Sequence, residues 1–204
     1  MRTFNAAVLG SPISHSLSPV IHSVAYEALE IPAKYTAVEV KSGKLAEYLD
    51  STPPELNSFS LTMPLKEELI NLGFPSSALA QRIKSGNTLI KIDGNWKVES
   101  TDVIGFQQSV SAKTSAFFEN ILILGAGATA RAAIAAFDSA GTQIDVASRS
   151  EHRENALRSS ALLAEITMIG FDDEIHWSKY DLVINTSPAH AADPLVAGIS
   201  GASA

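Results

Sequence analysis

A lysine stands at the start of an expected helix in the segment TMPLKEE (residues 62–68), where a cation is electrostatically disfavoured. Pro64 suits the first position of a helix, and Glu67 and Glu68 fall in its first turn, where the positive end of the helix dipole favours acids. Lys66 lies in that same turn, so its charged form is destabilised and it is suited to giving up a proton. A solvent-exposed lysine without a role is the ordinary alternative, and this segment alone favours it.

Two serines before another expected helix form a second candidate site. In the segment GSPISHSLSPVIH (residues 10–22), Ser16 and Ser18 flank Leu17 just before Pro19. Alternate residues of an extended segment point the same way, so both hydroxyls can face one ligand, such as a carboxylate, beside the helix N-terminus. The ordinary alternative is one serine that caps the helix and one without a role, and spacing alone slightly favours that alternative.

A glycine-rich turn in the second half of the chain indicates a nucleotide site. The segment LILGAGATA places Gly125, Gly127 and Ala130 in a G-x-G-x-x-A pattern between an apolar strand and an expected helix. The first glycine permits the tight turn, the second lets a pyrophosphate approach the backbone, and the small third residue lets the helix pack close to the strand. Such helix starts also arise from packing alone, but the flanking strand and helix favour nucleotide binding.

The residues after the next strand indicate which nucleotide binds. A site that prefers NAD usually carries an acid at the end of this strand, which binds the ribose 2′-hydroxyl. Here Ser148 takes that place and is followed by Arg149, with Arg153 close behind, whereas Asp145 lies too early in the strand. A guanidinium pairs bidentately with a 2′-phosphate and stacks on adenine. The pattern therefore favours NADP over NAD, and an ordinary basic helix start is the lesser alternative.

The composition of the chain excludes several classes of protein. Its 204 residues are 46% hydrophobic and 18% charged, with a formal net charge of −7, which argues against a general binder of nucleic acid or anionic membranes. The absence of cysteine excludes disulfides and thiol chemistry, and the five histidines show no metal-ligand spacing, so no metal site is expected. Because neither a signal-peptide layout nor a bilayer-spanning apolar run is present, we expect a soluble cytoplasmic protein.

Short apolar runs alternate with helical patterns, which predicts an α/β fold of two lobes with mostly parallel sheets. In the first lobe we expect strands at 5–10, 34–40 and 58–63, helices at 19–30, 42–51 and from Pro64, and a hairpin at 87–100 that turns at Asp93-Gly94. A helix at 102–113 joins the lobes. In the second lobe we expect a strand, turn and helix at 119–141, with the helix ending at Gly141, and strands at 143–149, 166–172 and 180–188.

The chain resembles the shikimate dehydrogenase family, the NADP-dependent enzymes of aromatic amino-acid biosynthesis. The segments that carry the resemblance are GSPISHSLSPVIH, SLTMPLKEEL, SGNTLI, STDVIGF, LGAGATARAA, ASRSEHR and DLVINTSP, in that order along nearly the whole chain. The first four are specific to this family and its quinate-using relatives. The resemblance implies a substrate-binding catalytic domain at residues 1–102 and a Rossmann-like NADP-binding domain at residues 103–204, incomplete at its C-terminus.

The resemblance also implies a catalytic pair, Lys66 and Asp102. Reduction of a ketone by hydride creates an alkoxide, to which Lys66 can supply a proton while Asp102 holds the ammonium and the substrate hydroxyl. The helix dipole favours loss of the lysine proton and Asp102 favours its retention, and the sequence leaves open which effect dominates. A salt bridge between the lobes is the minor alternative.

The remaining site residues implied by the resemblance fall into two groups. Ser16 and Ser18 hold the substrate carboxylate, and the other residues of the substrate pocket are Ser60, Thr62 and Asn87. The cofactor-binding residues are Gly125, Ala126, Gly127, Ala128, Thr129, Ala130, Ser148, Arg149, Ser150, Arg153, Thr186, Ser187 and Pro188.

The chain departs from the family pattern at three places. Ser60-Leu61-Thr62 replaces Asn-Val-Thr, so a substrate-facing amide has become a hydroxyl, and Ser100-Thr101-Asp102-Val103 replaces Asn-Thr-Asp-Gly. The sequence ends at VAGISGASA, where family members continue with further strands and with helices that return to the first lobe and carry a substrate-contacting glutamine. If the 204 residues are the whole molecule, we expect lower stability, self-association, and better NADP binding than shikimate turnover.

Three functions are compatible with these features. The leading one is the NADP-dependent interconversion of 3-dehydroshikimate and shikimate, in chorismate biosynthesis, by a monomer or homodimer without nucleic-acid or membrane partners. The second is a quinate/shikimate dehydrogenase that prefers NAD, which the absence of an acid at Ser148 disfavours. The third is a truncated, non-catalytic binding protein.

Overall fold

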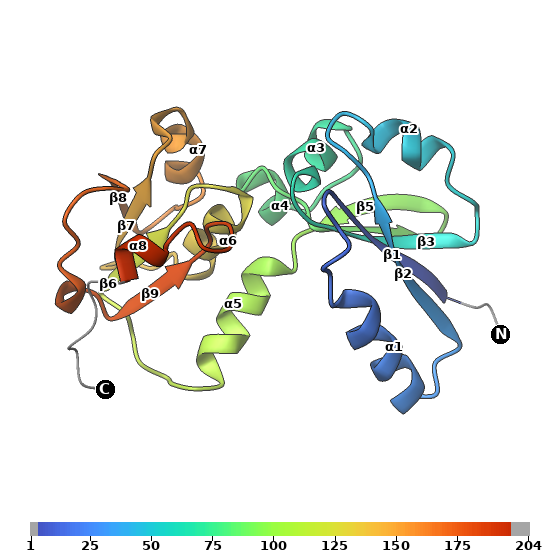
Figure 1. Cartoon of the computed structure of the whole chain (residues 1–204), viewed down its shortest axis with the longest axis horizontal. Coiled ribbons are helices and arrows are strands. Elements are labelled where there is room, and N and C mark those ends of the chain that lie inside the picture. The colour runs from blue at the N-terminus through green and yellow to red at the C-terminus, as the bar shows by residue number, and fades with distance from the viewer. Residues whose placement is uncertain (1–3, 197–204) are drawn as a thin grey trace. The chain divides into compact units, whose positions relative to one another are not determined.

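The computed structural model describes residues 4–196 (Figure 1). The chain divides into two compact units, Met1–Thr101 and Asp102–Ala204, and each is an α/β unit built around one sheet, which confirms the predicted fold class. The expectation that concerns the last residues of the sequence, 197–204, lies outside the described residues. Between residues 4 and 196, no helix is long and apolar enough to cross a membrane.

The first unit contains a five-stranded sheet in the order β2-β1-β3-β4-β5. β1 runs parallel to both of its neighbours, whereas β4 and β5 add the predicted hairpin in antiparallel pairing. The hairpin turns at Asp93 and Gly94, which both have positive φ (49° and 84°), as a two-residue type I′ turn requires. The strands are β1 (Phe4–Gly10), β2 (Ala33–Glu39), β3 (Leu56–Leu61), β4 (Thr88–Ile92) and β5 (Asn95–Glu99).

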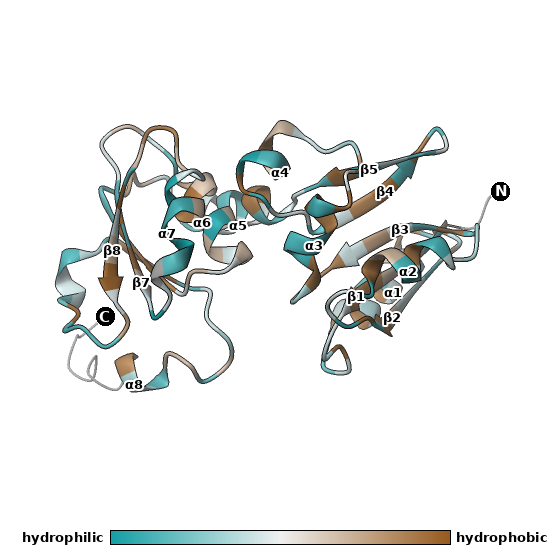
Figure 2. Ribbon diagram, turned by 90° about the horizontal axis from the view of Figure 1, so that it is seen from above, coloured by the Kyte–Doolittle hydropathy of each residue, from teal (hydrophilic) through white to brown (hydrophobic). Residues whose placement is uncertain are grey.

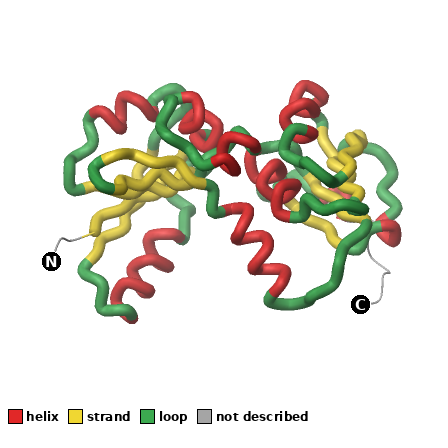
Figure 3. The backbone as a smooth tube through the Cα atoms, turned by 180° about the vertical axis from the view of Figure 1, so that it is seen from behind, coloured by secondary structure: helices red, strands yellow, loops and turns green. Residues whose placement is uncertain are grey.

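The helices of the first unit lie on opposite faces of this sheet (Figures 1 and 3). Helices α2 (Leu45–Asp50), α3 (Leu65–Asn71) and α4 (Ala78–Arg82) cover one face, and their apolar residues form the main core with alternate residues of the strands. Helix α1 (Ser18–Ala28) lies on the other face. No residue of α1 is buried, and its contact with the sheet depends on the rings of His22 and Tyr26.

The ends of β1 and β3 approach each other closely at Gly10. The N–H of Thr62 donates to the carbonyl of Leu9 (2.9 Å), and the N–H of Ser11 donates to the carbonyl of Met63 (3.1 Å). A Cβ added at Gly10 would lie 2.4 Å from Thr62 Cγ2 and 2.9 Å from the Met63 carbonyl oxygen. Only glycine therefore fits at the end of β1, and this approach joins the segment before α1 to the segment before α3.

The second unit contains a four-stranded parallel sheet in the order β8-β7-β6-β9. Apolar side chains of the strands form one core with residues of α5, α6 and α7 and another with residues 169–195, so both faces of the sheet are covered (Figure 2). The elements are α5 (Asp102–Ser111), β6 (Asn120–Leu124), α6 (Ala128–Ala136), β7 (Gln143–Ser148), α7 (Glu154–Arg158), β8 (Glu165–Gly170), β9 (Leu182–Asn185) and α8 (Asp193–Val196).

Helix α6 ends earlier than the sequence predicts, at Ala136 rather than Gly141. The cause is a long-range contact, because the carboxylate of Asp138 accepts three backbone N–H groups, from Leu162, Leu163 and Ala164, at 2.8–3.0 Å. Asp138 is thus committed to the loop before β8. Gly141 adopts a positive φ of 86° in the turn that leads into β7, so it ends the connection and not the helix.

The close approach at Gly10 leads to a first prediction. Gly10→Ala should lower the free energy of unfolding by about 1–3 kcal/mol, the usual cost of overpacking, because Thr62 and Met63 must move. Gly105→Ala is the control, since an added Cβ there meets nothing within 4 Å, and alanine in the helix should stabilise by about 0.5–1 kcal/mol. Urea unfolding of both variants measures the difference. A Gly10→Ala protein as stable as the parent would contradict the close approach of β1 and β3 at Gly10.

Candidate functional site

The two serines predicted to bind a carboxylate lie at the start of α1. Ser18 is the first helical residue, Leu17 takes the N-cap position, and the Ser16 Oγ accepts the N–H of Ser18 at 3.3 Å. Both serines are half-buried, whereas the Leu17 side chain between them is exposed. The structure therefore makes neither serine the N-cap residue, and the first turn of α1 has no side-chain cap.

A tyrosine that the sequence analysis did not identify joins two of the predicted substrate residues. The hydroxyl of Tyr35, on β2, donates to the Ser60 Oγ, on β3, at 2.7 Å, and Ser18 lies near enough to this hydroxyl to act on its pKa. We call these three residues the hydroxyl cluster. Burial raises the pKa of Tyr35 above its ordinary value, while the neighbouring Ser60 and Ser18 hydroxyls act in the opposite direction.

Thr62 and Asn87 lie at neighbouring strand ends of the same sheet. Thr62 follows β3 beside Gly10, and the N–H of Leu61 donates to the carbonyl of Asn87 at 2.7 Å. The Asn87 side chain is hydrogen-bonded to Thr101: its Oδ1 accepts the Thr101 N–H, and its Nδ2 donates to the Thr101 Oγ1, both at 2.9 Å. Asn87 therefore holds the last residue of the first unit, next in sequence to Asp102.

The two predicted catalytic residues each stand at the beginning of a helix. Pro64 is the N-cap residue of α3, one position earlier than expected, and Lys66 lies in the first turn together with Glu67 and Glu68, as predicted. The backbone carbonyl of Lys66 accepts the N–H of Gly86 at 3.0 Å, which ties this turn to the strand that begins at residue 88. Asp102 is the first residue of α5, in the second unit. Both side chains are half-buried, and their pairing stays a prediction.

The glycine-rich turn of the second unit has the geometry that the nucleotide motif predicts. Gly125 has a φ of 104°, and a Cβ there would lie 2.9 Å from Thr186 Oγ1 and 3.1 Å from the N–H nitrogen of Ser187. Gly127 is the N-cap residue of α6, with no side-chain cap, so the first N–H groups of the helix are available to phosphate oxygens. The nearest heavy atom to a Cβ at Gly127 is Arg153 Nη1, at 4.0 Å. The backbone here is an open cradle that fits a pyrophosphate.

The other residues of the turn have structural positions consistent with that cradle. Ala130 is fully buried and lets α6 pack against the sheet, and Ala126 is also buried. After β9, the Thr186 N–H and Oγ1 both donate to the carbonyl of Leu124, at 2.8 and 2.9 Å. Ala128 and Thr129 begin α6, and Ser187 and Pro188 continue from Thr186 past the carboxyl ends of β6 and β9.

The two arginines expected near a 2′-phosphate occupy different places. Ser148 is the last residue of β7, and its Oγ accepts the N–H of Ser150 at 2.9 Å, which closes a tight turn around Arg149. The Arg149 guanidinium is exposed and lies 4.9 Å from the centroid of the Phe171 ring. The Arg153 guanidinium instead lies beside the glycine turn, 3.5 Å from the carbonyl oxygen of Ala126. Arg153 is thus the arginine beside the glycine turn and Arg149 lies against the Phe171 ring, while their contacts with a cofactor stay predictions.

Asp145 has a structural partner set inside the second unit. It is buried within β7, and its Oδ2 accepts hydrogen bonds from Lys179 Nζ at 2.6 Å and from the Tyr180 hydroxyl at 2.7 Å. Burial and the neighbouring carboxylate raise the pKa of Tyr180. This geometry agrees with the expectation that Asp145 lies too early in the strand to contact a ribose.

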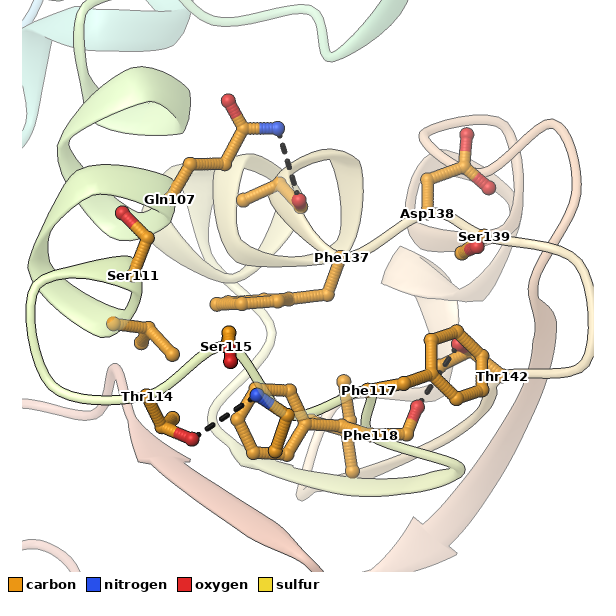
Figure 4. A pocket seen from close by; sticks show the side chains of 14 residues that line it. Gln107, Ser111, Thr114, Ser115, Phe117, Phe118, Phe137, Asp138, Ser139 and Thr142 are labelled. Carbon is orange, nitrogen blue, oxygen red and sulfur yellow. Dashed lines mark hydrogen bonds between the residues drawn. The ribbon is translucent and has the colours of Figure 1, made fainter.

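A pocket of about 310 Å³ lies at the other edge of the second sheet (Figure 4). Its lining includes Phe118, just before β6, and Ile121, near the start of β6. The glycine turn instead follows the carboxyl ends of the strands. Phe118 and Phe137 meet edge to face there, with ring centroids 6.1 Å apart. None of its lining residues is a predicted site residue, so the pocket is separate from the candidate cofactor site. Within residues 4–196, no group of three or more His, Asp or Glu side chains could hold a metal ion.

The separate places of the two arginines lead to a second prediction. Arg149→Ala should weaken NADP binding by about 1.5–3 kcal/mol, the range for hydrogen bonds to charged groups, and leave NAD binding nearly unchanged, because NAD has no 2′-phosphate. Arg153→Ala, the matched change beside the glycine turn, should weaken both cofactors alike. Isothermal titration with each cofactor measures the four affinities. An equal loss of NAD and NADP binding in Arg149→Ala would contradict the assignment.

Comparison with known proteins places this geometry in one family. Residues 8–89 match the model of the shikimate dehydrogenase substrate binding domain. A protein of Ignicoccus hospitalis named shikimate dehydrogenase (NADP(+)) is 31% identical over 89% of this chain and 68% of its own length. A protein of the same name from Thermus thermophilus is 33% identical over 82% of this chain and 69% of its own length.

Solved structures agree with the sequence comparison. The Thermus thermophilus shikimate 5-dehydrogenase in complex with NADP(H) and shikimate has a TM-score of 0.77 at 30% identity, covering 90% of this chain and 68% of that one. The shikimate dehydrogenase of Mycobacterium tuberculosis has a TM-score of 0.78 at 28% identity, covering 97% and 74%. Because relatives at least 31% identical align with most of the chain and with about two thirds of their own length, the chain belongs to the shikimate dehydrogenase family.

Proposed function

We propose that this protein is an NADP-dependent shikimate dehydrogenase, an oxidoreductase that interconverts 3-dehydroshikimate and shikimate in the biosynthesis of chorismate and the aromatic amino acids. The observation that carries the proposal is the presence of both half-sites in one chain of this family. The first unit brings Ser18, Ser60 and Tyr35 into one hydroxyl cluster, and the second unit presents the open cradle at Gly125 and Gly127.

In this proposal residues 1–102 bind the substrate. The Ser16 and Ser18 hydroxyls donate to the substrate carboxylate at the start of α1, where the positive end of the helix dipole favours negative charge. Thr62 and Asn87 hold further substrate hydroxyls from the ends of β3 and β4, where the close approach at Gly10 fixes the Thr62 backbone. Ser60 adds a hydroxyl from β3 on the side of α1.

Residues 103–204 bind NADP in this proposal. The pyrophosphate lies over Gly125 and Gly127, within reach of the N–H groups of Ala128 and Thr129 at the start of α6. The absence of an acid at Ser148 and the exposure of Arg149 beside it support a 2′-phosphate over a bare ribose.

Lys66 and Asp102 carry the proton chemistry. NADPH, when bound, supplies the hydride that reduces the ketone carbon, and the oxygen that becomes an alkoxide needs a proton. Lys66 gives its ammonium proton to that oxygen, and Asp102 orients the ammonium and the adjacent hydroxyl. In the direction of oxidation, Lys66 takes the proton back. We also propose a cytoplasmic location and a monomer or homodimer as the working form.

A spectrophotometric assay tests the proposed function. The full chain with shikimate and NADP should give an absorbance increase at 340 nm, with a much smaller rate when NAD replaces NADP. A rate with NAD equal to or above the rate with NADP would point to the quinate/shikimate dehydrogenase alternative, and quinate is run alongside to identify it. Binding of shikimate and NADP without any rate would overturn the enzymatic proposal in favour of a binding protein.

The assigned role of Lys66 gives a third prediction. Lys66→Met should lower kcat by about a hundredfold or more, the usual scale for a positioned acid or base, and change KM for shikimate far less. Lys34→Met, the same change on an exposed side chain near the start of β2, should leave both constants at the parent values. If KM rose steeply in Lys66→Met while kcat held, Lys66 would be a binding residue and the assigned proton transfer would be wrong.

A further inference from the structure

We propose that Tyr35 is a positioning residue for the substrate, because it holds the Ser60 hydroxyl as a hydrogen-bond donor toward an oxygen of the bound molecule. This inference rests on the proposed function for the identity of the substrate, shikimate. The contact between Tyr35 on β2 and Ser60 on β3 crosses β1, which lies between them in the first sheet.

The register of the sheet explains how Tyr35 reaches Ser60. Tyr35 pairs with Ala6, and Ser60 pairs with Val8, so β1 lies between the two strands that carry the hydroxyls. Ala6 and Val8 share one face of β1, since residues two apart in a strand point the same way. The tyrosine ring packs in a cluster with both of them, and its length carries the hydroxyl from β2 across β1 to β3.

The tyrosine ring is held by its neighbours, so the hydroxyl has a defined place. His22 of α1 stacks on the ring with centroids 4.0 Å apart and planes at 1°, and Ile13 packs in the same cluster. Only 8% of the Tyr35 surface is exposed. Because the ring is already confined, little further side-chain entropy is lost when its hydroxyl orients the Ser60 hydroxyl. A ligand contact that is ordered in advance in this way is pre-organised.

The numbers of donors and acceptors on the two hydroxyls limit where the Ser60 proton can point. A tyrosine hydroxyl has one proton to donate, and a serine hydroxyl has one proton and two lone pairs. Because Tyr35 donates to the Ser60 oxygen, the Ser60 proton is left for an acceptor other than Tyr35. Burial raises the pKa of Tyr35, so its hydroxyl stays protonated, and stays a donor, at neutral pH.

The ligand chemistry that fits this arrangement is an oxygen acceptor next to a second hydroxyl donor. Ser18 lies near the Tyr35 hydroxyl as well, and it stands in the first turn of α1, where the positive end of the helix dipole favours negative charge. A carboxylate of shikimate bound near Ser18 therefore brings acceptor oxygens into the region that Ser60 faces. Tyr35 acts through Ser60 and Ser18 and touches neither the cofactor nor the reacting carbon in this account.

Tyr35→Phe is the variant that tests the inference, because it removes the hydroxyl and keeps the ring that His22 stacks on. KM for shikimate should rise roughly 2- to 12-fold, the range for one hydrogen bond, while kcat and KM for NADP stay within about twofold. Tyr48→Phe is the matched control, since it removes a hydroxyl from a tyrosine packed against Phe59 in the main core, on the other face of the same sheet. It should leave KM for shikimate unchanged.

Ser60→Ala and the double variant show whether Tyr35 acts through Ser60. If it does, Tyr35→Phe should add less than twofold to KM in the Ser60→Ala background, although it raises KM in the parent. A merely structural role would lower the melting temperature and change kcat or NADP affinity as well. An unchanged KM for shikimate in Tyr35→Phe, in a parent that turns shikimate over, would overturn this inference alone. A parent that neither binds nor turns over shikimate would overturn the proposed function and this inference together.

Discussion

In each unit a glycine at the end of the first strand packs against a threonine just past the end of the neighbouring strand, and the candidate site depends on that contact. A Cβ would lie 2.4 Å from Thr62 Cγ2 at Gly10 and 2.9 Å from Thr186 Oγ1 at Gly125. Because the glycine has no side chain, the backbone at the end of its strand lies close to the threonine of the neighbouring strand. Their following loops leave the sheet together, at the carboxyl edge where parallel α/β sheets place their ligands.

The two units use this contact for different chemistry. At Gly10 it joins the segment that carries Ser16 and Ser18 to the segment that carries Lys66. At Gly125 the chain turns with a positive φ and presents backbone N–H groups instead of side chains. A small polar substrate needs several directed donors, whereas a pyrophosphate needs a close approach to bare backbone, and the residues that follow each glycine match those needs.

Local patterns in the sequence predicted the parts of the fold that depend on neighbouring residues. The Asp93-Gly94 turn, the glycine turn and Lys66 in the first turn of α3 follow from short-range rules for φ angles and helix ends. Contacts between distant segments were not predictable in this way. Asp138 ends α6 early because it binds a loop more than twenty residues away, and Tyr35 reaches Ser60 only through the order β2-β1-β3, which a strand pattern does not reveal. The place of Arg149 beside Phe171 and that of Arg153 beside Ala126 likewise depend on residues more than twenty positions away in the sequence.

In the proposed function the substrate binds at the strand ends around Gly10 and Thr62, and not in the pocket of about 310 Å³ at the start of β6. Amide chemical shifts of the isotopically labelled full chain, followed during a titration with shikimate and no cofactor, test this claim most directly. The account predicts that the largest saturable shifts fall on residues 10–18, 60–66 and 87, with residues 107–121 and 136–142 unmoved. Shifts centred on those pocket residues, with residues 10–18 and 60–66 unchanged, would contradict it.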